Sequence, residues 1–401
     1  MRKDVDRILA ERDIGSMLLY ADRPLDVNLY YLTGFLSFGP TVYLKKVDEE
    51  PVMIVIPADV QRAERESLVK RVCSYFDFEG FEIVKSASDQ RIGLIRFIAA
   101  VAKKELDMKK LIYVPPVLSV MVADVLRHEG LNITPLFDVI EEARQTKEPD
   151  EIEAIESVQR TAEKAMTKAI EFIADSEVGT KDALYYLEGG RKKVLTVGKI
   201  RSILNQILSD GNCIAEGGEL QVASGIKSAD PNCTGEAEDV LRANQPIVLD
   251  IFPRSTKRLY HTDMARTMVK GKASKQIKNM FEAAFQAKDA AVDAMKAGIL
   301  GRDIEDRCFR ILEKAGYETM RGGKQIARGL LHDVGHGVGL DSNERPAING
   351  FQKCILEEHN VVTAELGLYD PDVGGVRLED ILEITRSGCR NLTELEVRLE
   401  V

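Results

Sequence analysis

The first part of the chain alternates between short apolar segments and amphipathic segments. Residues 1–15 have apolar positions at helical spacing, and so do residues 58–72 and 92–106. Short apolar runs typical of strands occupy residues 16–20, 28–35, 41–46, 51–57 and 111–115. The charged turn VDEE between two of these runs indicates a hairpin. Alternation of this kind predicts a compact α/β domain that ends near residue 140.

A long helix is predicted from Pro149 to about residue 174. Acidic residues crowd its first turn, where the helix dipole favours negative charge. We place a domain boundary just before this helix, which divides the chain into residues 1–143 and 144–401. The second of these parts combines helical and strand patterns.

Strand-like apolar runs dominate the end of the chain. They occupy residues 220–225, 246–252, 259–269, 360–369 and 375–385. Helical patterns are found at about 180–190, 197–210, 274–298 and 302–316.

Composition and charge exclude several classes of partner. Hydrophobic residues make up 44% of the chain and charged residues 30%, as in ordinary globular proteins. The net charge of −10 argues against nucleic acid or an anionic membrane as the main partner. We expect no membrane span, since no run of 18 apolar residues is present, and no signal peptide, since the N-terminus is charged. The six cysteines form no C-x-x-C pair, so we expect free thiols in a cytoplasmic protein.

Two carboxylates interrupt apolar strands. Asp250 lies in PIVLDIF, a segment that is otherwise apolar on both faces. Burying a carboxylate there is costly unless it is paired or binds a metal ion. A hairpin folded about residues 256–257 would place Asp250 directly opposite Asp263 in the next strand. A cation is then needed between the two, either a metal ion or the side chain of Arg266.

Two further acids pose the same problem. Glu365 interrupts the apolar run VVTAELGLY, and Glu379 follows in GVRLEDIL. His336, in the glycine-rich stretch HDVGHGVG, is a further candidate metal ligand. Four carboxylates and one imidazole carry a charge that two divalent cations would cancel, and such ligands suit Mn²⁺, Fe²⁺, Co²⁺ or Zn²⁺. A pair of these ions holds a hydroxide and polarises a carbonyl group.

At these residues the sequence resembles the pita-bread metallopeptidases: methionine aminopeptidase, aminopeptidase P and prolidase, with creatinase as a relative. The matching segments are VLDIF, DMART, VGHGVG, AELGLY and GVRLED, in the order of the family. Upstream, NLYYLTGF and RQTKEPDEI resemble the creatinase-like N-terminal domain and the linker helix after it. The resemblance implies an α+β fold, with a creatinase-like α/β domain at 1–143 and a pita-bread metallopeptidase domain at 144–401.

The resemblance also implies a role for each ligand. Asp250 would chelate one metal ion and His336 the other, while Asp263 and Glu379 would bridge the two. Glu365 would bind the second ion and act as the general base. The implied cofactor is two divalent ions, Mn, Co or Zn. The implied reaction is hydrolysis of X–Pro bonds in a peptide or small amide substrate, of the Xaa-Pro aminopeptidase or dipeptidase type, by a homodimer.

Two positions depart from the family pattern. Asn343 and Asn232 stand where the family has histidines that contact the substrate. Asparagine donates a hydrogen bond but does not become cationic near neutral pH. We place both asparagines, together with Arg377, in the substrate-binding set. His332 matches a histidine of proline-specific members and is a candidate catalytic group, the alternative being a structural histidine; His261, which shares a face with Asp263, is a candidate compensating group.

Three functions therefore stay open at the level of sequence. The first is a dinuclear X–Pro peptidase. The second is a metal-binding homologue with weak or no peptidase activity, because losing one oxyanion donor typically costs roughly 10²–10³ in rate. The third is a hydrolase of a different small amide or amidine. Creatinase-like chemistry uses no metal, so retention of all five ligands favours the metal-dependent alternatives.

Overall fold

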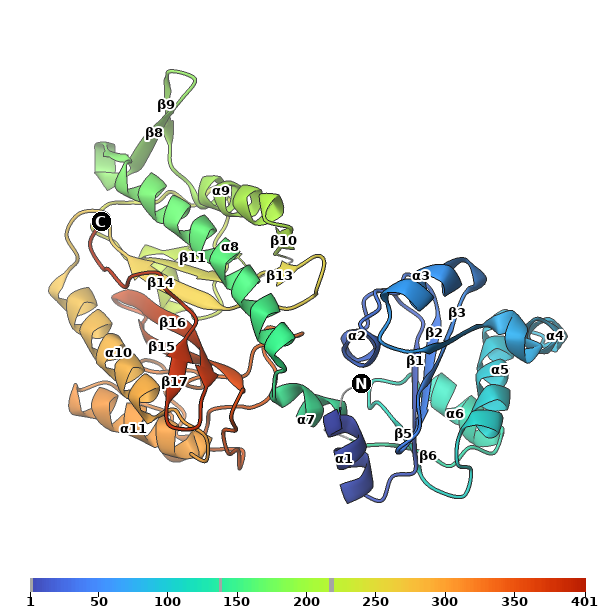
Figure 1. Cartoon of the computed structure of the whole chain (residues 1–401). Helices are drawn as coiled ribbons and strands as arrows, with labels where there is room; N and C mark the ends of the chain where they lie inside the picture. The colour runs from blue at the N-terminus through green and yellow to red at the C-terminus, as the bar shows by residue number, and fades with distance from the viewer. Residues whose placement is uncertain (1–2, 137–138, 216–219) are drawn as a thin grey trace. The chain divides into compact units, whose positions relative to one another are not determined.

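The computed structural model describes residues 3–136, 139–215 and 220–401 (Figure 1). The chain divides into two compact units, Met1–Arg144 and Gln145–Val401. No helix in the described ranges is long and apolar enough to cross a membrane.

The described part of the first unit is built on a six-stranded mixed sheet in the order β4-β3-β2-β1-β5-β6. Its strands are β1 (Ser16–Ala21), β2 (Thr41–Lys46), β3 (Val52–Val55), β4 (Arg71–Ser74), β5 (Ile112–Val114) and β6 (Ile133–Pro135). Its helices are α1 (Lys3–Glu11), α2 (Val27–Thr33), α3 (Val60–Glu66), α4 (Gly80–Ser86), α5 (Gln90–Glu105), α6 (Val120–His128) and α7 (Val139–Gln145). Strands β2 and β3 pair antiparallel, which confirms the predicted hairpin.

The prediction of a strand at 28–35 is wrong, because this segment forms helix α2. The side chain of Asp26 accepts a hydrogen bond from the amide of Leu29 and caps the helix at its start. Gly34 ends it in the left-handed conformation, with φ of 65°. The aromatic and leucine residues that suggested a strand face the core of the unit, and the caps decide the conformation.

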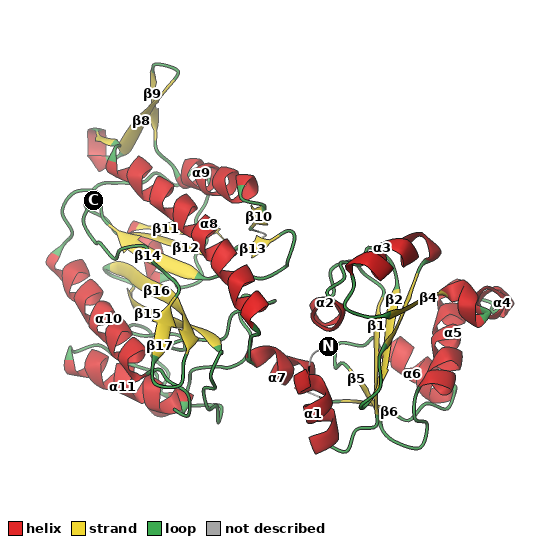
Figure 2. Cartoon of the chain, viewed as in Figure 1, coloured by secondary structure: helices red, strands yellow, loops and turns green. Residues whose placement is uncertain are grey.

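The second unit contains a curved antiparallel sheet with helices packed on its outer face (Figure 2). The strands of the sheet are β11 (Leu220–Ser224), β12 (Ile247–Ile251), β14 (Met264–Met268), β16 (Gly374–Ile384) and β15 (Val361–Asp370), with β17 (Cys389–Asn391) paired to β16. The shorter strands outside it are β7 (Glu177–Val178), β8 (Leu184–Glu188), β9 (Arg191–Val194), β10 (Cys213–Ile214) and β13 (Arg254–Ser255).

Two apolar cores hold the helices of this unit to the sheet. Helices α8 (Pro149–Ala174) and α9 (Val197–Asp210) pack against β11, β12 and β14. Helices α10 (Lys275–Ala294) and α11 (Gly301–Lys314) pack against β15 and β16. Figure 1 shows the two helix pairs along opposite flanks of the sheet. Both helix pairs pack on the same face of the sheet, and strand parity places Asp250, Glu365 and Glu379 on the opposite face.

The prediction of a helix at about 180–190 is wrong. Strands β8 and β9 form a hairpin there, closed by Gly189 and Gly190, which both have positive φ angles of 57° and 76°. A two-residue turn of this kind matches the twist of the flanking strands and favours glycine. The tyrosines of LYYLE are therefore strand residues, and the helical spacing of this short segment is coincidental.

The register of the β12–β14 hairpin also differs from the prediction. Asp250 pairs with Ala265, not with Asp263. The connection turns slightly later along the chain, as the bridge between Arg254 and His261 shows. The residue opposite Asp250 changes by two positions, from 263 to 265. Because side chains alternate between faces with a period of two, Asp250 and Asp263 still lie on the same face, as diagonal neighbours.

Candidate metal centre

The segment that carries His336 runs beside strand β15. The amide of Thr363 donates to the carbonyl of His336 at 2.7 Å, and the amide of Glu365 donates to the carbonyl of Val334 at 2.9 Å. A Cβ atom added at Gly335 would lie 2.2 Å from the carbonyl oxygen of Thr363. The glycine before the histidine therefore allows the close approach that brings the imidazole to the sheet.

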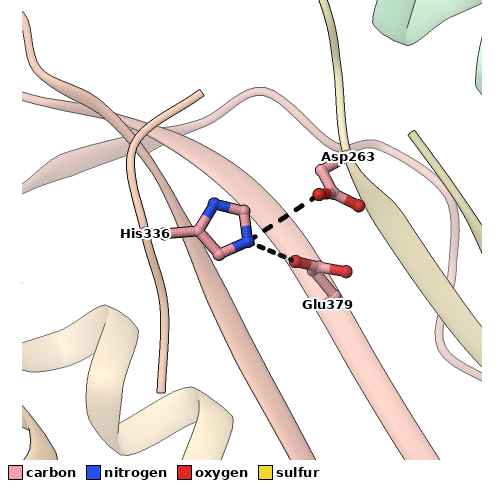
Figure 3. Close-up of side chains that lie close together, drawn as sticks. All are labelled: Asp263, His336 and Glu379. Carbon is pink, nitrogen blue, oxygen red and sulfur yellow. Dashed lines mark ion pairs between the residues drawn. The ribbon is translucent and has the colours of Figure 1, made fainter. Parts of the chain in front are cut away.

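Strands β15 and β16 place two carboxylates opposite each other, Glu365 against Glu379. Glu379 also pairs with Ala265 of β14, so Asp263 approaches from the third strand. The Nε2 atom of His336 lies 3.8 Å from an oxygen of Asp263, 3.9 Å from Glu379 and 4.0 Å from Glu365. Figure 3 shows His336, Asp263 and Glu379 pointing toward one another. One imidazole nitrogen thus faces three carboxylates, two from strands β15 and β16 and one from the residue directly before β14.

Several of the buried carboxylate oxygens have no hydrogen-bond partner. Oxygen atoms of Asp250, Asp263 and Glu379 are buried without a hydrogen-bond partner. Burial, and then the negative charge of neighbouring carboxylates, raises the pKa of Asp263 and of Glu379 well above the ordinary values. Such orphaned oxygens beside one imidazole nitrogen fit the ligand set of a divalent transition-metal ion. The residues present therefore match a metal centre.

Arg377 is the cation that contacts Asp250. Its guanidinium group forms an ion pair with Asp250, donates to the hydroxyl of Tyr369 at 2.8 Å and donates to the carbonyl of Pro231 at 2.9 Å. The prediction that Arg266 could be the cation between Asp250 and Asp263 is wrong, since Arg266 pairs with Asp380 at 2.8 Å.

The presence of Arg377 changes the charge of the cluster. The guanidinium also lies 3.4 Å from an oxygen of Glu365. Four carboxylates with one guanidinium leave a formal charge of −3, where the sequence alone indicated −4. Charge balance therefore favours at least one divalent ion and is compatible with two.

His332 lies at the edge of the same cluster. Its Nε2 atom is 2.9 Å from the hydroxyl of Tyr369, and its Nδ1 atom is 3.7 Å from Glu365. Burial lowers the pKa of His332, which favours the neutral ring. For Glu365, burial raises the pKa, but His332, Arg377 and His336 outweigh it and the net shift is downward. Glu365 is therefore the carboxylate most readily ionised in the group.

Comparison with models of known protein families identifies the family of the chain. The model of metallopeptidase family M24 matches residues 153–386, more than half of the chain, and that of the Creatinase/Prolidase N-terminal domain matches residues 1–145. This chain belongs to metallopeptidase family M24. The predicted fold is confirmed: a creatinase-like N-terminal unit followed by a pita-bread domain.

Relatives of this M24 metallopeptidase match it along the whole chain. It is 27% identical over 402 residues to an Xaa-Pro dipeptidase of Pyrococcus furiosus, and the match covers 100% of both chains. It is 25% identical to an Xaa-Pro dipeptidase of Pyrococcus horikoshii, over 100% of this chain and 99% of the relative. The solved structure of an Xaa-Pro dipeptidase from Bacillus anthracis superposes with a TM-score of 0.80 at 20% identity, over 100% of this chain and 99% of the other.

The two asparagines of this M24 metallopeptidase lie in exposed turns. The amide of Asn232 donates to the side chain of Asp230 at 2.9 Å, and the carbonyl of Pro231 before it is held by Arg377. Asn343 is exposed in the turn that follows the His336 segment. In the described ranges, no hydrogen bond joins either side chain to the carboxylate cluster. The structure therefore brings together the predicted metal ligands and leaves both asparagines at the periphery.

His261 is buried outside the cluster. Its Nδ1 atom lies 3.1 Å from the carbonyl of Phe252, and its amide donates to the carbonyl of Gly339 at 2.7 Å. These contacts are structural, so the geometry gives no support to His261 as a compensating group.

Tyr369 was not predicted from the sequence, although it connects His332 to Arg377 through its hydroxyl. A signal was present, because Tyr369 follows Glu365 by four residues and so lies on the same face of strand β15. Strand parity identifies this residue once the metal-ligand strand is known.

Proposed function

We propose that this M24 metallopeptidase hydrolyses X–Pro bonds in short peptides, as an Xaa-Pro dipeptidase or aminopeptidase, with two divalent ions of manganese, cobalt or zinc. The observation that carries the proposal is the position of the His336 imidazole within 4.0 Å of three carboxylates. Relatives named Xaa-Pro dipeptidase that match the whole chain support this class of substrate.

The proposed ligand roles follow the geometry of the cluster. Asp263 and Glu379 would hold both ions, and His336 and Glu365 would complete the ligands of one of them. Asp250, with one oxygen free of Arg377, completes the other. When bound, such ions polarise the scissile carbonyl group and activate water.

Glu365 is the proposed proton carrier. The carboxylate is ionised and lies 4.0 Å from the Nε2 atom of His336, and in this role it would accept a proton from the attacking water and pass it to the leaving amine. His332 acts beside it as a hydrogen-bonding group, held by the hydroxyl of Tyr369. A neutral ring at this place orients the substrate without adding a charge.

Arg377 supports the substrate side of the site indirectly. Its donors are engaged by Asp250, Tyr369 and the carbonyl of Pro231, the residue before Asn232. We assign it the role of fixing the turn that presents Asn232 to the substrate. Asn343 completes this substrate-binding set from the loop after His336.

A weak peptidase, or a hydrolase of a different small amide, is the second candidate function. The observation in its favour is that two positions expected to hold cation-forming histidines are occupied by Asn232 and Asn343, both exposed. Neutral amides stabilise a developing oxyanion less than imidazolium does.

An assay separates the two functions. The protein is reconstituted with Mn²⁺, Co²⁺ or Zn²⁺ and tested on X–Pro dipeptides, on longer X–Pro–X peptides and on dipeptides without proline. The first function predicts metal-dependent cleavage restricted to the X–Pro bond. Metal binding without cleavage of any of these peptides supports the second. The homodimer and the cytoplasmic location stay predictions.

A further inference from the structure

We propose that Gln159 of helix α8 is a positioning residue that sets the separation of the metal ligands Asp263 and Glu379 from behind the sheet. The inference rests on the proposed metal centre. It concerns the hydrogen bonds of Gln159, whose side chain makes no direct contact with the proposed metal ligands.

The side chain of Gln159 is fully buried and uses both ends of its amide. Its carbonyl oxygen accepts a hydrogen bond from the hydroxyl of Thr262, and its nitrogen donates to the hydroxyl of Thr393 at 3.1 Å. Thr262 directly precedes Asp263 in the chain. One amide therefore links the side chain of the residue before Asp263 to Thr393, which lies in the segment after β17.

The second end of the link reaches the other ligand. The hydroxyl of Thr393 accepts a hydrogen bond from the amide of Ile381 at 3.0 Å. Ile381 lies two residues after Glu379 in strand β16 and on the same face of it. The chain of contacts from Thr262 through Gln159 and Thr393 thus ends beside Glu379.

This link adds to a small number of direct contacts between the two ligand-bearing strands, one of which is the hydrogen bond from Arg266 to the carbonyl of Glu379 at 2.7 Å. The ladder between β14 and β16 contains the single pair Ala265–Glu379 in the described residues. On the far side of that pair, Thr267 bonds to the backbone of Arg377 at 2.7 and 2.9 Å. On the near side, where Asp263 precedes the first residue of β14, Gln159 makes the connection.

The chemistry of the amide suits this position. An amide donates and accepts at once, so it satisfies the two buried hydroxyl groups on either side of it. A methionine of similar size fills the same volume but leaves both hydroxyls without this partner. Loss of an outer partner that orients a metal ligand typically weakens metal binding by about 10–100-fold.

Metal titration of folded protein tests the proposal. Mn²⁺ affinity is measured by calorimetry for the wild type and for Gln159→Met, Thr262→Val and Thr262→Ser. We expect Gln159→Met and Thr262→Val each to weaken Mn²⁺ binding by about 10–100-fold. Thr262→Ser keeps the hydroxyl and retains the affinity. The double variant Gln159→Met/Thr262→Val is no weaker than the weaker single variant, because both remove the same link.

Ser176→Ala is the matched control, since it removes a buried hydroxyl at the end of the same helix, bonded to Ile173 at 2.6 Å. It leaves Mn²⁺ affinity unchanged. Wild-type affinity in Gln159→Met, or equal losses in Thr262→Ser and Thr262→Val, would overturn the proposal. Failure of the wild type itself to bind Mn²⁺ would refute the metal centre instead. If Gln159→Met does not fold, the comparison of Mn²⁺ affinity between Thr262→Val and Thr262→Ser tests the proposal.

Discussion

Glu365 and Glu379 lie directly opposite each other on neighbouring strands, and the Nε2 atom of His336 lies within 4.0 Å of both. Two ionised carboxylates in this relationship repel each other unless a cation lies between them. The helices packed against the opposite face of the sheet, together with the β15–β16 ladder, keep the pair together. The fold therefore holds a charge arrangement that is unfavourable without a metal ion.

Removal of one of the proposed bridging carboxylates is expected to affect the metal-free protein and its response to metal differently. Asp263→Asn reduces the cost of burying a charge and removes the repulsion that Asp250 and Glu365 exert on Asp263. We expect the thermal midpoint of the metal-free variant to rise by about 2–4 °C. Added Mn²⁺ raises the midpoint of the wild type and leaves that of the variant nearly unchanged. A lower midpoint for the metal-free variant would count against this account.

A buried ion pair anchors the loop after His336, the proposed metal ligand. Lys147 and Glu344 lie 2.7 Å apart with side chains 1% and 8% exposed, and Glu344 pairs through its backbone with Gly337. Lys147→Met leaves the Glu344 charge buried without this cation and destabilises the fold by about 3 kcal/mol. The double variant Lys147→Met/Glu344→Leu recovers part of that loss. Urea unfolding of the three proteins measures both effects, and equal stability of Lys147→Met and wild type would disprove the first.

If the protein is the proposed X–Pro peptidase, we expect Asn232 and Asn343 to limit its rate. Introducing histidine at Asn232 and Asn343 adds groups that become cationic and stabilise a developing oxyanion. We expect the double variant to raise kcat/KM on X–Pro dipeptides by about 10²-fold. Steady-state kinetics with each single variant shows which position matters more. A fall in kcat/KM in the double variant would mean that the asparagines serve a different substrate geometry.

The pH dependence of stability is predicted at Glu383, away from the metal ligands. Burial raises its pKa, but His359 and Arg390, at 3.0 and 2.8 Å, outweigh it and lower the pKa below the ordinary value. A lowered folded-state pKa stabilises the fold above the unfolded pKa near 4.3, and the gain is lost as the pH falls through the folded value. Glu383→Gln therefore destabilises the protein at pH 7, by about 1 kcal/mol because both partners are half exposed. The difference shrinks below pH 4; a difference that is independent of pH would exclude the ion pair as its cause.

Much of the site follows from sequence because a charge inside an apolar strand is conspicuous. Asp250 and Glu365 were found in this way, and the glycines around His336 marked a close backbone approach. The position of the hairpin turn decides which residue faces Asp250, and nothing in PRSTKR fixes that position locally. The sequence therefore predicted the face of Asp250 correctly and its partner wrongly.

Long-range contacts were beyond the reach of sequence patterns. The choice of Arg377 over Arg266 as the partner of Asp250 depends on how β16 aligns with β14, which periodicity does not specify. The helix at 27–33 was missed although its caps, Asp26 and Gly34, are visible in the sequence. Caps deserve more weight than apolar content in segments this short, because packing accepts aromatic residues in either conformation.

Metal stoichiometry tests the central claim most directly. Protein stripped with a chelator is titrated with Mn²⁺, and the bound ions are counted by elemental analysis and located by anomalous scattering from crystals. We predict two ions per chain, one beside His336 and Glu365 and one beside Asp250, both in contact with Asp263 and Glu379. A folded protein that binds no Mn²⁺, Co²⁺ or Zn²⁺ at these residues would contradict the account.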